Sequence, residues 1–478
     1  MRVRFAASSP MSSSSSHRRS SPDAACRRPT GTGWMVAASQ RAPLMLRALF
    51  YSGRVRRTTT SPASRVYLDH AATAPVRPEV AEQVAADLRG RLGGWANPAA
   101  QHASGRRAGA MLAQARARLA AALEVDPHEV LFASGGTQAD ALVVAGRVLA
   151  ARAAGTDGPR VVTSPIEHPA VLDSARTAAA HLGAEHVVIG VDDAGLVDRA
   201  DLREAVVGPR TALVSIMTAN NETGVVQDMA ALVEAVREAS GAWRPTEPGY
   251  VPVHSDAVAA LGRVPVRFRD WGLDAMTITG HKIGAPVGTG ALVARRDLTL
   301  VAPTGGGRQE RGLRSGTQDV VGARALALAV ELAVAERAEE SARLEALRGR
   351  LLEGATALPG AHATLPEGAA HVASTAHLWF EDCDAEALLM ALDTAGIDAS
   401  AGSACHAGVA RPSHVLLAMG LEEGPARSTL RCSMGGATVI ADVERLLAAL
   451  PAALETARRA RAFHARPRVG GFRWNRAG

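Results

Sequence analysis

The chain has 478 residues, 47% of them apolar and 21% charged, which is the composition of an ordinary soluble globular protein of two or three domains. Its net charge of +6 comes from its ends, because residues 1–65 carry +11 and residues 456–478 carry +7, so that residues 66–455 carry −12. An acidic body argues against a nucleic-acid-binding protein, and the lack of an apolar run of roughly 18 residues or more argues against a membrane protein.

Residues 1–65 are predicted to lack a fold. They are rich in serine and arginine, hold one acid, Asp23, and show no sustained hydrophobic period. This composition is typical of an organellar transit peptide. The alternative, which we favour because arginine is abundant along the whole chain, is a start assigned too far upstream, with Met11, Met35 and Met45 as later starts. We therefore expect a cytoplasmic protein, or an organellar one if the extension is a transit peptide.

Between residues 66 and 320, short apolar runs alternate with helical periods. Helices are expected from Pro78, from a cap at Ser104 to about Leu123, and over about 138–152. Order is expected to begin at 66–70, and strands are expected at 130–134, 161–163, 213–217, 251–256 and 275–279. Strands that alternate with helices predict an α/β fold with a large, mostly parallel sheet.

Residues 321–456 are predicted to form a second, smaller α/β domain. A long helical period over about 321–355 leads into residues 376–380, and a helix at 384–395, a loop of small residues at 400–408 and a last helix over about 438–456 follow. Residues 457–478 are expected to be a solvated basic tail.

Lys282 is the only lysine of the chain, since the other 52 residues in the count of Lys plus Arg are arginines. Arginine serves for surface charge and for anions, but it stays protonated and cannot form a Schiff base. A desolvated lysine loses its proton and attacks a carbonyl group. Lys282 lies just after the strand at 275–279, and open α/β sheets bind ligands at strand ends. We therefore favour a Schiff-base lysine over an ordinary surface lysine.

Two further groups follow strands and suit the same cofactor. Asp256 ends an apolar run, and Gly136 and Thr137 begin a helix whose N-terminus attracts a phosphate. Each of these alone is more often a cap or a turn. Pyridoxal phosphate needs a lysine, an acid at its pyridine nitrogen and a phosphate cradle, and this chain supplies all three at successive strand ends.

At these stretches the chain resembles the cysteine desulfurases, pyridoxal-phosphate enzymes of fold type I that are grouped with the class V aminotransferases. The matching stretches follow the family's order over about 66–440 and are Tyr67–Thr73, Asn97-Pro98, Ser134–Thr137, Glu167-His168, Asn220–Gly224, His254–Asp256, Gly280–Lys282, Arg314–Thr317, Ser400–Cys405 and Arg431–Gly435. The run Gly-Ser-Ala-Cys405, followed by Arg411-Pro-Ser-His-Val-Leu416, is similar to the members with a short cysteine loop. The resemblance implies a large cofactor-binding domain at 66–320 and a small C-terminal domain.

The resemblance also implies a role for each matching residue. Lys282 would hold the cofactor and remove the substrate Cα proton, His168 would stack on the ring and assist proton transfer, and Cys405 would accept the sulfur. Arg431, with Asn97, would bind the substrate carboxylate. The remaining cofactor-binding residues would be Gly136, Thr137, Asn221, Asp256, Thr279 and His281, together with Thr317, which would reach the phosphate in the neighbouring subunit of a homodimer.

The other cysteines, Cys26, Cys383 and Cys432, form no C-x-x-C pair with Cys405 or with one another, so no metal site or redox dithiol is predicted. Cys383 and Cys432 are expected to be structural. Few cysteines also suit a reducing compartment.

The implied reaction converts L-cysteine to L-alanine and leaves a persulfide on Cys405, whose sulfur would pass to an iron–sulfur scaffold or a tRNA-thiolation protein. A selenocysteine lyase or another class V aminotransferase-like enzyme is the alternative enzyme, and a non-catalytic homologue that only binds partners is the alternative of another class. The chain departs from the family at Ala259, where glutamine is usual, at Gln138, where glutamate is usual, at Cys432, where phenylalanine is frequent, and in Gly305–Arg311, which is one residue longer.

Overall fold

The computed structural model describes residues 65–90, 96–402 and 412–464, all within one compact unit of the chain, Ser61–Gly478. Cys405 and Cys26 lie outside the described residues, as do the predicted N-terminal extension up to residue 64 and the end of the predicted basic tail.

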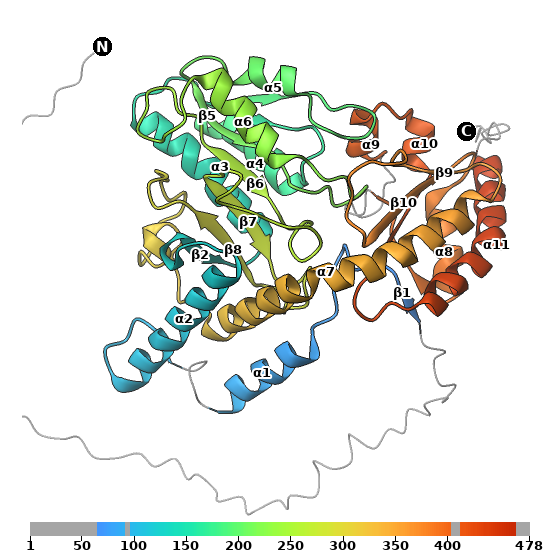
Figure 1. Ribbon diagram of the computed structural model, residues 1–478, viewed down its shortest axis with the longest axis horizontal. Coiled ribbons are helices and arrows are strands. Elements are labelled where there is room, and N and C mark those ends of the chain that lie inside the picture. The colour runs from blue at the N-terminus through green and yellow to red at the C-terminus, as the bar shows by residue number, and fades with distance from the viewer. Residues whose placement is uncertain (1–64, 91–95, 403–411, 465–478) are drawn as a thin grey trace, which may run out of the picture. The chain divides into compact units, whose positions relative to one another are not determined.

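The largest sheet has seven strands, all parallel except β8, which is antiparallel to both of its neighbours (Figure 1). In spatial order its strands are β2 (Val130–Ala133), β8 (Gly290–Ala294), β7 (Ala275–Thr279), β6 (Val253–Asp256), β5 (Thr211–Ser215), β3 (Arg160–Thr163) and β4 (Glu185–Val188). The predicted α/β class with a mostly parallel sheet is confirmed.

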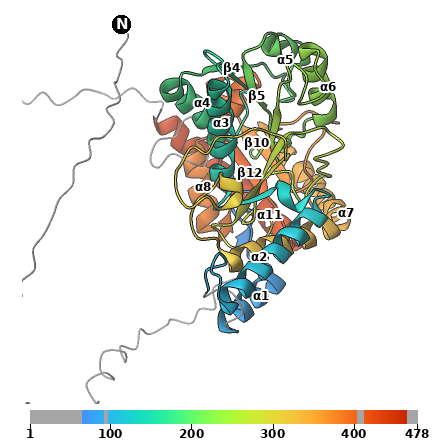
Figure 2. The ribbon, with the colours of Figure 1, turned by 90° about the vertical axis from the view of Figure 1, so that its left-hand side faces the viewer.

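Helices cover both faces of this sheet, because successive side chains of a strand point to opposite faces. Leu131 of β2 packs in the apolar cluster of α3 (Gly136–Ala153) and α4 (Pro169–Leu182). Its neighbour Phe132 packs in the cluster of α2 (Ala103–Ala122), α6 (Met229–Ser240) and the first part of α7 (Val320–Thr356). Figure 2 shows α3 and α4 side by side. The helices that accompany the sheet are α1 (Pro78–Arg89), α2 (Ala103–Ala122), α3 (Gly136–Ala153), α4 (Pro169–Leu182), α5 (Arg199–Val206) and α6 (Met229–Ser240).

A second apolar core surrounds the antiparallel sheet β12–β10–β9 and the short parallel pair β1–β11. The strands here are β1 (Val66–Tyr67), β9 (Ala361–Ala363), β10 (Thr375–Phe380), β11 (Ile397–Asp398) and β12 (Thr429–Ser433). The helices of this core are α8 (Ala385–Thr394) and α11 (Ile440–His464). Two short helices, α9 (His414–Ala418) and α10 (Glu423–Arg427), pack instead in a separate apolar cluster with Ile166 and Met217.

Helix α7 (Val320–Thr356) runs from the first core to the second (Figure 1). Its residues 320–333 pack against the large sheet, and residues 344–355 pack in the second core. The first strand also belongs to the second core, since Val66 and Leu68 pack there. The predicted boundary between residues 320 and 321 therefore falls at the start of a helix shared by both cores, and the division into two domains stays a prediction.

Two predicted helix ends were wrong. The cap of α2 is His102, whose Nδ1 accepts from the backbone N–H of Gly105 at 3.2 Å, rather than Ser104, which lies inside the helix. Helix α11 continues to His464, past the predicted end at 456. The reason is burial, because Ala457 is fully buried in the second core and so extends the apolar face.

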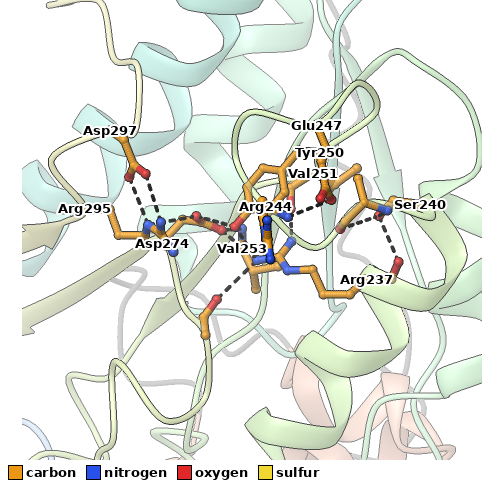
Figure 3. Close-up of polar contacts among 12 residues, drawn as sticks. Arg237, Ser240, Arg244, Glu247, Tyr250, Val251, Val253, Asp274, Arg295 and Asp297 are labelled. Carbon is orange, nitrogen blue, oxygen red and sulfur yellow. Dashed lines mark hydrogen bonds and ion pairs between the residues drawn. The ribbon is translucent and has the colours of Figure 1, made fainter.

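A buried ionic cluster fastens the loop between α6 and β6 (Figure 3). The carboxylate of Asp274 accepts hydrogen bonds from Arg237 at 3.0 Å, from the Tyr250 hydroxyl at 2.7 Å and from the backbone N–H of Val253 at 2.8 Å. The guanidinium of Arg237 also stacks on the Tyr250 ring, 4.2 Å from its centroid. The cluster fixes the start of β6, the strand that ends at Asp256.

Of the helices that the structure describes, none is both long and apolar enough to cross a membrane.

Candidate active site

A cavity of about 790 Å³ opens where the strands of the large sheet end, beside the second core. Such a volume suits a small ligand or cofactor. The cavity collects most of the predicted site residues, namely Gly136, Thr137, His168, Asn221, Asp256, Thr279, His281, Lys282 and Arg431. All of them except Arg431 meet because they follow or end strands of the large sheet, and the carboxyl ends of strands that run in the same direction share one edge of a sheet. Arg431 reaches the cavity from β12 in the second core.

Two predicted residues do not line this cavity. Asn97 is exposed and its side-chain oxygen accepts from the backbone N–H of Ala99 at 2.9 Å. Thr317 is exposed as well. A substrate role for Asn97 and a role for Thr317 toward a neighbouring subunit stay predictions.

Lys282 lies in a tight turn just after β7. The turn requires Gly280, because a Cβ there would lie 2.3 Å from the Thr289 hydroxyl and 2.7 Å from the Ala285 Cβ. The Lys282 ammonium donates to the backbone carbonyls of Ala71 at 2.5 Å and Ala72 at 2.7 Å. The single lysine of the chain is therefore partly buried at the cavity wall, held by the segment that follows β1.

Asp256 lies at the end of β6 and is buried. Burial raises the pKa of Asp256, while the backbone N–H of Val258 and the charge of Lys282 oppose the increase. A second acid, Asp140 of α3, lines the same cavity, and its pKa is raised well above the usual range by burial and by the nearby Asp256. The Oδ1 of Asp140 has no hydrogen-bond partner within the described ranges and lies 3.7 Å from the Nε2 of His254. The two neighbouring buried acids, Asp140 and Asp256, therefore favour a ligand that presents a positively charged group to this part of the cavity wall.

The turn from β2 to α3 presents a helix N-terminus to the cavity. The first N–H groups of a helix have no partner inside the helix, so they are free to bind an anion. A Cβ at Gly136 would lie 3.1 Å from Cγ2 of Val258, so glycine leaves the close approach here without any shift of that side chain. Thr137, Thr279 and His281 add polar side chains to the same wall. These groups together can hold a phosphate.

His168 caps α4, because its Nδ1 accepts from the backbone N–H of Ala170 at 3.1 Å. An accepting Nδ1 places the ring proton on Nε2. Burial, helped by Lys282 and His414, lowers the pKa of His168 to about 4. The ring is thus neutral at neutral pH and able to stack on an aromatic ligand or to pass a proton.

Arg431 comes from β12 in the second core and is buried. One terminal nitrogen, Nη2, donates to the carboxylate of Asp69 at 2.8 Å, and Nη1 donates to the backbone carbonyl of Asn221 at 2.9 Å. The guanidinium thus faces the cavity, where it can bind a carboxylate.

The two described cysteines are buried thiols. Burial raises the pKa of Cys383 and of Cys432 to about 12 in each case, so neither forms a thiolate readily. Cys405 lies outside the described residues, but Gly402 and Pro412, on either side of its segment, both line the cavity.

Sequence reasoning missed several polar residues of this region. Glu222 is buried, and its Oε2 accepts from the Ser413 hydroxyl at 2.5 Å, while burial raises its pKa to about 7. Asp140 lies one helical turn after Thr137, and this spacing was the available signal for it. Asp69 and Glu222 stand inside stretches that were noted as motifs, but nothing local marks them as partners of distant side chains.

The comparison with protein families matches residues 66–446 to the family described as aminotransferase class-V. An IscS-like cysteine desulfurase of Mycobacterium tuberculosis is 44% identical over 401 residues, which cover 82% of this chain and 97% of that protein. The chain belongs to the cysteine desulfurase family. A cysteine desulfurase of Gluconacetobacter diazotrophicus is 37% identical over 387 residues, covering 81% of this chain and 92% of the relative.

Solved structures of the family are also similar. A NifS-like protein has a TM-score of 0.73 and 30% identity, covering 82% of this chain and 99% of its own. DndA from Streptomyces lividans has a TM-score of 0.62 and 34% identity, covering 77% and 99%.

Two departures from the cysteine desulfurase pattern have a structural reading. Gln138 replaces glutamate, and its side-chain oxygen accepts from the backbone N–H of Ser134 at 2.8 Å, which an amide does as well as a carboxylate. In the longer stretch 305–311, the buried Glu310 carboxylate forms two hydrogen bonds with Arg116, each at 2.7 Å. Ala259 lines the cavity and brings no polar group to it.

The residues of the cavity fit pyridoxal phosphate, the cofactor of the class V aminotransferases and cysteine desulfurases. The cavity offers an amine at Lys282, a buried acid at Asp256 and a glycine-lined helix N-terminus at Gly136. These are the three kinds of group that the cofactor requires.

Proposed function

We propose that this protein is a pyridoxal-phosphate-dependent cysteine desulfurase that converts L-cysteine to L-alanine and stores the released sulfur as a persulfide on Cys405. The observation that carries the proposal is that Lys282, Asp256 and the N-terminus of α3 line one cavity in a chain of this family. The reaction balances, because L-cysteine and the Cys405 thiol give L-alanine and the Cys405 persulfide.

In this reaction the side chains of the cavity bind the cofactor and move protons. Lys282 holds the cofactor and moves the proton of the substrate Cα, and pyridoxal phosphate, when bound, takes up the electron pair that this proton leaves behind. Asp256 holds the protonated pyridine nitrogen. The phosphate is held by the N-terminus of α3 with the side chains of Thr137, Thr279 and His281.

Three other residues position the substrate and the ring. His168 stacks on the ring as a neutral imidazole, since its pKa is lowered to about 4, and its Nε2 proton is free to help proton transfer. Asn221 binds the ring hydroxyl. Arg431 binds the substrate carboxylate from the opposite core.

Cys405 is the sulfur acceptor in this proposal. Its thiolate attacks the substrate sulfur, so that an S–S bond forms as the Cβ–S bond of L-cysteine breaks, and Cβ takes a proton to complete L-alanine. The buried state of Cys383 and Cys432, with their raised pKa values, supports this assignment because neither thiol is available.

We further propose a homodimer in which Thr317 reaches the phosphate of the neighbouring subunit. The persulfide sulfur would then pass to a second protein, an iron–sulfur scaffold or a tRNA-thiolation protein. Mixing persulfidated protein with each class of acceptor and measuring which one gains sulfur would identify the recipient.

The proposal is tested by incubating purified protein with L-cysteine and a thiol reductant and measuring L-alanine and sulfide. Equal amounts of the two are expected from the wild type and none above background from Lys282→Arg, which keeps the charge without a reactive amine. A wild type that makes no L-alanine, or one that acts on L-selenocysteine alone, would overturn the assignment.

A further inference from the structure

Arg431 already has a carboxylate partner inside the protein. Its Nη2 donates to Asp69 at 2.8 Å, and the Arg431 side chain is 4% exposed against 19% for that of Asp69. The backbone around Asp69 is fixed to the same strand, because Asp69 bridges Ser433 and the Ser433 hydroxyl accepts from the backbone N–H of Ala71 at 2.8 Å. The pair is thus part of the fold and not a chance contact between mobile side chains.

The Asp69 segment also contacts the catalytic lysine. The carbonyls of Ala71 and Ala72, which follow Asp69, accept from the Lys282 ammonium. One short stretch of chain therefore holds both of the cations that the proposed reaction needs for its substrate.

The hydrogen bonds of Arg431 to Asp69 and Asn221 engage its two terminal nitrogens but not its Nε. Its Nε is buried and has no hydrogen-bond partner in the part of the chain that the structure covers. A buried N–H without a hydrogen-bond partner costs free energy, so an acceptor close to this nitrogen would be stabilising. A substrate carboxylate bound by Arg431 would share the guanidinium with the negative charge of Asp69.

We propose that Asp69 is a positioning residue and resident counter-ion that holds Arg431 toward the cavity and weakens its hold on the α-carboxylate of an amino-acid substrate. This inference rests on the proposed function, since it assumes that Arg431 binds that carboxylate. The substitution Asp69→Asn would keep a side-chain oxygen that accepts from Arg431 but remove the competing charge. Asp69 therefore sets substrate affinity, and its replacement by asparagine tightens binding.

The test compares the holoenzyme with Asp69→Asn. We expect the KM for L-cysteine and the dissociation constant of L-alanine, followed by the change in the cofactor's visible absorption, to fall about threefold or more, because a charge this close acts strongly in a partly buried site. kcat should change less than KM. Asp69→Ser, which is neutral and smaller, is the second variant if Asp69→Asn folds poorly, and the same tightening of L-alanine is expected.

The matched control is a ligand without a carboxylate. Cysteamine should bind the wild type and Asp69→Asn equally, because it has no group for Arg431. An unchanged or weaker affinity for L-alanine in Asp69→Asn would overturn the inference, and so would an equal gain for cysteamine, which would indicate a general effect on the cavity. A wild type that binds L-alanine but never desulfurates L-cysteine would refute the proposed function and leave this inference standing.

Discussion

Replacing Asp274 by asparagine should strongly destabilise the protein. Asp274 is 1% exposed and is the only carboxylate within ion-pair distance of the buried Arg237 among the described residues. Asparagine has the same shape but leaves this guanidinium without a counter-charge. Removing one partner of a buried pair typically costs about 3–5 kcal/mol of unfolding free energy, and we expect a loss in this range. For a chain of this size it corresponds to a decrease in Tm of roughly 3–6 °C.

Thermal unfolding followed by circular dichroism measures this loss. The matched control is Asp270→Asn, which breaks an exposed pair with Arg267 at 3.3 Å whose side chains are 61% and 62% exposed, and such a pair contributes about 0–1 kcal/mol. Its Tm should stay within about 1 °C of the wild type. If Asp274→Asn unfolds at the same temperature as this control, the cluster of Figure 3 does not fix β6 as argued.

Three further predictions concern pH, sulfur transfer and the N-terminal segment. Burial raises the pKa of Glu167 from 4.5 to about 8, so the folded state holds a proton that the unfolded state loses, and stability falls as the pH rises between these values. Glu167→Gln should remove this fall, so the Tm of the variant relative to that of the wild type should increase from about pH 5 to about pH 9. A Tm difference that stays constant over this pH range would refute the prediction. Cys405→Ser should still change the cofactor spectrum on addition of L-cysteine but lose sulfide release by orders of magnitude, and near-normal release would remove Cys405 from the mechanism. Deleting residues 1–60 should leave Tm and turnover unchanged, and a large drop in either would contradict the prediction.

The elements that could be predicted from the sequence are those with a strong local pattern. The fully buried strand β7 was visible as an apolar run, and α7 as a long helical period. The end of α11 could not be found in this way, because Ala457 is small and its burial depends on α8 and α7 lying beside it. The cap at His102 was missed because serine is the commoner cap and both residues stand at the boundary.

The site residues, too, could be predicted where a local pattern marks them and not where the contact is long-range. Lys282, Asp256 and Thr137 could be identified from the sequence because each ends or follows a strand, and strand ends meet at one edge of a sheet. The ion pair between Asp69 and Arg431 could not be identified from the sequence, because 362 positions separate the two residues and neither is unusual in its own stretch. Contacts between the two cores depend on how they pack, which no local pattern encodes.

Following the sulfur of L-cysteine onto the protein shows directly whether Cys405 accepts it. The holoenzyme is given sulfur-labelled L-cysteine without reductant, cleaved into peptides and analysed by mass spectrometry. We expect one added sulfur atom, carrying the label, on the peptide that contains Cys405, with an equal amount of L-alanine and no label on Cys383 or Cys432. Label on either buried cysteine, or L-alanine formed with Cys405 unmodified, would contradict this expectation.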